Sequence, residues 1–214
     1  MKLTKYAHAC VVVEDERGAV LVDPGAFTPN AAELVASVRA VLVTHEHFDH
    51  VDVGVLDDAL GRRDDLHVYG PGTVVDRWVE GHSDRVHRVR PGDRFTAGGL
   101  PVAAFGGQHA AIHADVPRVD NVGYLVGGTV FHPGDAYLVP DERVSTLLVP
   151  TSGPWTKLGD AVDYVRAVDP DRIVQIHEVM LSDLGQASVS RFLSPEQLSK
   201  VALTVLPAGA SIDV

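Results

Sequence analysis

The sequence contains a single cysteine, Cys10, among its 214 residues. One cysteine excludes an intramolecular disulfide and any zinc site built from several thiolates. Cys10 lies in the apolar run of residues 9–13, so we expect it to be buried and assign it no function. Metal chemistry in this chain would therefore depend on histidine and carboxylate side chains.

Long hydrophobic runs are also absent. The longest, such as residues 11–13 and 41–43, are far too short to cross a bilayer. Residues 1–6 are not followed by the apolar stretch and cleavage site that define a signal peptide. We therefore expect a protein without a membrane anchor that works in the cytoplasm.

Positive charge is scarce in this chain. It has 18 Lys and Arg against 29 Asp and Glu, a formal net charge of −11. This is the wrong sign for a protein whose main task is to neutralise nucleic-acid phosphates. The charge therefore favours a small-molecule substrate over a nucleic acid. The sequence leaves open whether the protein is a homo-oligomer.

Apolar patterning indicates one α/β domain over residues 1–214. Hydrophobic residues make up 45% of the chain, and no low-complexity linker divides it. Short β-type runs come first, and the turn sequence at residues 15–18 predicts a hairpin between two of them. Strands then alternate with helices in both halves of the chain. This order predicts two sheets packed together with helices outside them.

Helical patterns occur in six places. Asn30 and Asp160 precede two of them, and both residue types favour the N-cap position. The six predicted helices follow Asn30, cover residues 53–60, about 73–79 and 161–168, and lie around 186–192 and near 195–201. The first four lie between predicted strands, as in a layered α/β protein.

The densest group of metal-binding residue types lies directly after the predicted strand at residues 40–43. Residues 44–50 contain His45, His47, Asp49 and His50 in one loop. Such donors suit zinc, manganese or iron. A single histidine there could be incidental, but four polar donors beside a core strand are costly unless they bind something. The loop is not the His-Glu-x-x-His helix of metalloproteases, because Asp49 occupies the place of the second histidine.

The spacing His45-x-His47-x-Asp49-His50 between a strand and a helix resembles the signature of the metallo-β-lactamase superfamily. His109, Asp135 and His177 each follow an apolar strand, in the order that this family shows. The resemblance implies a four-layer αββα sandwich that binds two divalent ions. It implies that His45, His47 and His109 hold the first ion, that Asp49, His50 and His177 hold the second, and that Asp135 bridges both.

Residues 6–10, 109–113 and 121–124 most resemble the branch of ascorbate-6-phosphate lactonase and related metal-dependent hydrolases. Class B β-lactamases have a cysteine ligand where this chain has Asp135, so we do not expect antibiotic hydrolysis as the main activity. Asp23 matches the family's aspartate beneath the site, where it would orient a ligand histidine. The alternative for Asp23 is a simple turn residue before Pro24.

The resemblance implies hydrolysis by a hydroxide held between the two ions, oriented by Asp135, with Asp49 also in the catalytic set. His113 or His8 would donate a proton if either faced the pocket, and a buried, hydrogen-bonded histidine is the alternative for each. Trp155 is a candidate for stacking on a substrate and Lys157 for binding an anionic group. A packing tryptophan and a solvated lysine are their alternatives.

Three functions remain open at this point. The first is hydrolysis of a small, anionic lactone or other ester, which the local resemblance favours. The second is phosphodiesterase activity on a nucleotide or lipid-derived diester, because dinuclear sites in general can bind phosphate. The third is a non-catalytic metal or ligand sensor, against which the complete ligand set argues.

Overall fold

The computed structural model describes all 214 residues, and two seven-stranded sheets form its centre. The first sheet contains Lys2–Lys5 (β1), Val11–Asp15 (β2), Gly18–Val22 (β3), Ala40–Leu42 (β4), His67–Gly70 (β5), Val86–Arg88 (β6) and Ser211–Asp213 (β14). The second contains Arg94–Ala97 (β7), Leu100–Gln108 (β8), Asp120–Val126 (β9), Val130–His132 (β10), Thr146–Pro150 (β11), Arg172–Ile176 (β12) and Leu203–Thr204 (β13). The strand orders are β14-β1-β2-β3-β4-β5-β6 and β13-β12-β11-β10-β9-β8-β7. Each half of the chain therefore builds one sheet, except that β14 returns to pair with β1.

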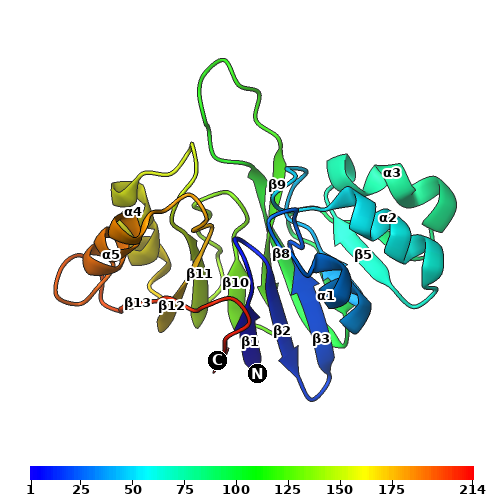
Figure 1. Cartoon of the computed structure of the whole chain (residues 1–214), viewed down its shortest axis with the longest axis horizontal. Helices are drawn as coiled ribbons and strands as arrows, with labels where there is room; N and C mark the ends of the chain where they lie inside the picture. The colour runs from blue at the N-terminus through cyan, green and yellow to red at the C-terminus, as the bar shows by residue number, and fades with distance from the viewer.

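Five helices cover the outer faces of the sheets (Figure 1). They are Ala31–Ser37 (α1), Val53–Arg62 (α2), Gly72–His82 (α3), Leu158–Val168 (α4) and Asp183–Phe192 (α5). In Figure 1, α1, α2 and α3 lie on one side of the molecule and α4 and α5 on the other, with the strands between them. This is a four-layer αββα sandwich, so the predicted fold class is confirmed.

Three buried clusters hold the four layers together. Along β2, Val11 and Val13 point into the cluster between the two sheets, whereas Val12 points into the cluster under the first group of helices. Successive strand residues face opposite sides of a sheet, and here both sides are apolar. Trp78 of α3 belongs to the same outer cluster as Val12, and Val165 of α4 belongs to the third. Burial on both faces explains why the strands are continuous apolar runs.

The predicted hairpin at residues 15–18 is confirmed, since Asp15 pairs with Gly18 between β2 and β3. Asn30 is the N-cap of α1, although its side chain makes no capping hydrogen bond. Asp160 is not the cap of α4, because the helix begins earlier and Lys157 takes that position. Asp160 instead lies in the first turn, where its negative charge interacts favourably with the helix dipole and stabilises the helix.

The helix predicted near residues 195–201 is wrong. This segment forms turns, in which the Ser199 N–H donates to the Ser194 carbonyl at 3.1 Å. Only a few residues separate this segment from Leu203, which pairs with β12. A helix that short gains little stability by itself, so the segment forms turns.

The predicted ligands all lie just beyond the ends of strands. Four strands end directly before the loops that contain the predicted ligands: β4 at Leu42, β8 at Gln108, β10 at His132 and β12 at Ile176. In Figure 1 the long loop after β8 rises at the end of the sandwich away from the two chain termini. No helix has the length and apolar content that crossing a membrane requires.

Candidate metal centre

Side chains from several loops converge into two groups of four possible metal donors. The first group is His45, His47, His109 and Asp135, and the second is His8, Asp49, His50 and His177. Within each group, one donor atom from every residue lies within 4.8 Å of the others. All are buried except His47 and Asp49, which are half-buried. The structure therefore brings together every ligand predicted from the sequence and adds His8.

Asp135 lies between the two groups. Its carboxylate oxygens are 3.1 Å from His50 Nε2, 3.3 Å from His109 Nε2 and 3.0 Å from His177 Nε2. Trp155 Nε1 donates a hydrogen bond to its Oδ2 at 3.0 Å. Burial by itself raises a carboxyl pKa, but the surrounding histidines hold the pKa of Asp135 well below its usual range. A carboxylate in contact with histidines of both groups suits the predicted bridging position.

Asn121 fixes the backbone that presents Asp135. Its Oδ1 accepts from the Asp135 N–H at 2.9 Å, and its Nδ2 donates to the Pro133 carbonyl at 2.8 Å. Gly134 has a φ of +64°, and a Cβ atom there would lie 2.2 Å from Asn121 Oδ1. Glycine is therefore required at this turn. No local sequence pattern indicates this role of Asn121, because only the pairing of β9 with its neighbours brings the residue to Asp135.

Asp23 lies beneath the donor groups and is fully buried. Its Oδ1 accepts from the Thr44 N–H at 2.8 Å, and its Oδ2 accepts from Thr44 Oγ1 at 2.7 Å. The same Oδ2 is 2.6 Å from His50 Nδ1. Asp23 thus holds the His50 ring so that Nε2 faces Asp135, which is the orienting role predicted for it.

The charge on His50 leads to a prediction about metal binding. Burial lowers its pKa, but Asp135 and Asp23 together raise the pKa of His50 well above its usual value. A raised pKa favours the protonated ring in the protein without metal, whereas a ligating imidazole must be neutral. We expect metal binding to release this proton, and the apparent affinity to rise with pH.

Calorimetric titration of zinc at one pH, in buffers with different heats of ionisation, measures the released proton directly. A binding heat independent of the buffer would contradict this expectation.

Of the remaining candidates, one is buried at the site and two are exposed. Trp155 is buried against the site, with its ring centroid 5.8 Å from that of His109. Lys157 is exposed, and its Nζ lies 3.6 Å from an Asp160 carboxylate oxygen. His113 is also exposed, and its nearest acidic partner is Asp115 at 3.5 Å. The structure does not bring His113 or Lys157 to the donor groups, so the roles of proton donor and anion-binding lysine find no support in their positions.

The sequence of the chain matches a known family. Residues 2–177 match the family model described as the beta-lactamase superfamily domain. The chain belongs to the beta-lactamase superfamily. This match confirms the resemblance that the histidine spacing indicated.

Individual relatives align with this chain over different parts of its length. It is 37% identical over 188 residues to Protein Rv0786c of Mycobacterium tuberculosis, covering 85% of this chain and 86% of that protein. It is 30% identical over 122 residues to the Probable L-ascorbate-6-phosphate lactonase UlaG of Salmonella paratyphi B, which covers 48% of this chain and 34% of the lactonase. Among solved structures, Igni18, described as a novel metallo hydrolase from Ignicoccus hospitalis, has a TM-score of 0.73 at 18% identity. That alignment covers 99% of this chain and 97% of Igni18.

These matches bear on the predicted enzyme class. The class predicted from the sequence, a metal-dependent hydrolase of the metallo-β-lactamase fold, is confirmed at the level of the superfamily. The relatives do not share one named substrate.

Proposed function

We propose that this superfamily member hydrolyses a small, anionic lactone or other ester, using two divalent ions bound by the two donor groups. The observation that carries the proposal is the position of Asp135, whose carboxylate contacts histidines of both groups. Imidazole and carboxylate donors suit zinc, manganese or iron. When bound, such a pair of ions supplies a water of lowered pKa and stabilises negative charge on the attacked group.

The buried polar atoms of the site fit a pair of cations. His50 Nε2, His177 Nε2 and Asp135 Oδ1 are buried, and although both nitrogens lie within 3.1 Å of the Asp135 carboxylate, none of the three atoms makes a hydrogen bond of good geometry. Buried polar atoms without partners cost free energy, and bound cations would satisfy all three. Burial also holds the pKa of His45 well below its usual value, which keeps this imidazole neutral and able to bind metal.

A cavity of about 550 Å³ beside the first donor group supports the anionic substrate. Trp155 lines this cavity and also donates to Asp135, so the cavity and the donor groups share a wall. Arg118 lines it as well, with its Nε donating to the His109 carbonyl at 2.6 Å. Asp160, the acidic residue of the lining, pairs with Lys157 and not with Arg118, so the Arg118 guanidinium is free to bind a substrate carboxylate or phosphate.

Replacing Arg118 with Gln tests this assignment. We expect KM for an anionic ester to rise about tenfold or more, since a hydrogen bond to a charged group contributes about 1.5–3 kcal/mol. The KM for a neutral ester of the same size should not change. Arg166→Gln is the matched control, because Arg166 is also exposed and its Nε also donates to a carbonyl, that of Leu198. Equal losses on both esters would contradict the role of Arg118.

The choice of substrate class is tested by a paired assay on protein loaded with manganese or zinc. Lactone ring opening is followed by acid release, and a chromogenic phosphodiester is assayed in parallel. Lactone turnover that disappears in Asp135→Asn supports the proposal, whereas diester turnover would support the phosphodiesterase alternative. If neither substrate is hydrolysed although two ions are bound, the result would favour the non-catalytic sensor. We further propose that the protein acts in the cytoplasm on a small molecule rather than a nucleic acid, as its net charge of −11 supports.

A further inference from the structure

His8 lies in the turn between β1 and β2 with an unusual backbone conformation. The turn is closed by a hydrogen bond from the Tyr6 N–H to the Cys10 carbonyl at 2.8 Å. Within it His8 has a φ of +58°, which non-glycine residues rarely adopt and which costs about 1–3 kcal/mol. His177 has a φ of +59°, and its N–H donates to the His8 carbonyl at 3.0 Å. Two strained residues far apart in the sequence are therefore bonded to each other beside the donor groups.

An ion pair between buried Lys5 and half-buried Glu178 connects the His8 turn to the strand end that carries His177. Lys5 is only 2% exposed, and its Nζ lies 2.6 Å from Glu178 Oε1. The same oxygen accepts from the His8 N–H at 3.3 Å. Burying a lysine is costly unless it is paired, so this contact is a specific feature of the fold. It fixes the His8 backbone relative to His177.

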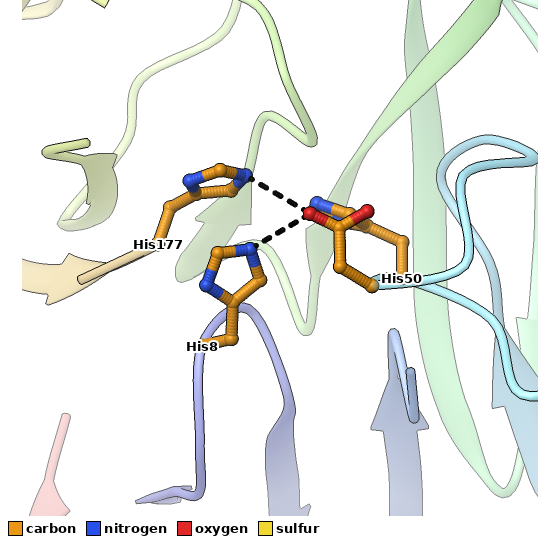
Figure 2. A group of neighbouring side chains, drawn as sticks. His8, His50 and His177 are labelled. Carbon is orange, nitrogen blue, oxygen red and sulfur yellow. Dashed lines mark hydrogen bonds and ion pairs between the residues drawn. The ribbon is translucent and has the colours of Figure 1, made fainter. Parts of the chain in front are cut away.

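The side chain of His8 points into the second donor group. In Figure 2 the rings of His8 and His177 are both directed toward one carboxylate oxygen. This oxygen is Oδ2 of Asp49, which lies 3.1 Å from His8 Nε2 and 3.7 Å from His177 Nε2. The two rings are 3.7 Å apart between centroids, and His8 is 1% exposed. Its imidazole is thus as close to the second group as the predicted ligands are.

We propose that His8 is a fourth protein donor to the second metal ion, beside Asp49, His50 and His177. The inference rests on the proposed function, because it assumes that the second group binds an ion. It assigns the N-terminal turn a direct part in metal binding, and it gives the Lys5–Glu178 pair the role of positioning that turn. The alternative is that His8 only donates a hydrogen bond to Asp49.

Two substitutions distinguish these roles. His8→Asn suits the backbone, because asparagine tolerates positive φ better than most residues, but it removes the imidazole. His8→Gln keeps a donor that can hydrogen-bond to Asp49, and also lacks the imidazole. His87→Asn is the control, since His87 is half-buried near His67 and lies outside both donor groups. Each variant is titrated with cobalt, whose visible spectrum reports the ligand set, and with zinc by calorimetry.

The expected result is that both His8 variants bind the first ion as wild type does and lose affinity for the second. The loss should exceed about 100-fold, the upper end of what removing an outer partner of a ligand costs. The visible spectrum of the second cobalt ion should change as well. The His87 variant should match wild type in both measurements.

Other outcomes overturn distinct claims. Unchanged second-ion affinity and spectrum in both variants would remove His8 from the ligand set. Recovery in His8→Gln alone would show that His8 only positions Asp49. Wild-type protein that binds fewer than two ions would instead overturn the proposed function itself.

Discussion

Replacing Asp135 with Asn should lower the rate of hydrolysis by more than about 100-fold, which exceeds the effect of removing a residue that only hydrogen-bonds to a metal ligand. The carboxylate lies within 3.3 Å of His50, His109 and His177, which belong to both donor groups. An amide of the same shape has no negative charge with which to bridge two cations. Its oxygen can still accept from Trp155, so the local packing is retained.

Turnover of the metal-loaded Asp135→Asn variant is compared with that of wild type, and far-ultraviolet circular dichroism checks the fold. Asp171→Asn is the control, because Asp171 is exposed and pairs only with Arg143 on the surface. Full activity in the Asp135 variant would eliminate the bridging assignment. A variant that fails to fold would mean that Asp135 is needed for structure, and metal binding by His109→Asn would then test the site.

The second large effect is on stability. Replacing Asp23 with Ala should reduce the free energy of unfolding by about 3–5 kcal/mol, the usual effect of removing one partner from a buried, hydrogen-bonded charge pair. The substitution leaves the Thr44 N–H, the Thr44 hydroxyl and the His50 ring without their acceptor inside the protein. Asp23→Asn should cost less, because one oxygen remains to accept.

Urea unfolding in the presence of a chelator measures this change in the protein alone, without a contribution from bound ions. Asp65→Ala serves as the surface control, since the side chain of Asp65 is 52% exposed. A loss in Asp23→Ala no larger than in the control would show that Asp23 is only a turn residue before Pro24. That alternative was open from the sequence.

Much of the site could be predicted because its residues follow strands whose apolar character is obvious. The loop with His45, His47 and His50 is a local pattern, and His109 and His177 each come directly after a strand. The hairpin at residues 15–18 is local in the same sense. Information of this kind lies within a few residues of sequence, so pattern and spacing are enough to find it.

The parts that could not be predicted depend on contacts between distant segments. His8 joins the second donor group only because its turn is bonded to His177 and Glu178, about 170 residues later. Strand pairing brings Asn121 to Asp135. No local sequence pattern predicts this contact or that of His8. His113 follows His109 closely in the sequence, yet its loop points it into solvent. Proximity along the chain was therefore a poor guide to proximity at the site.

The most direct test of a two-ion centre is an anomalous-difference map from crystals of the protein loaded with manganese or zinc. We expect two peaks in each chain. One should lie among His45, His47 and His109, the other among His8, Asp49, His50 and His177, with Asp135 in contact with both. A single peak, or none at these side chains in fully loaded crystals, would contradict a two-ion centre.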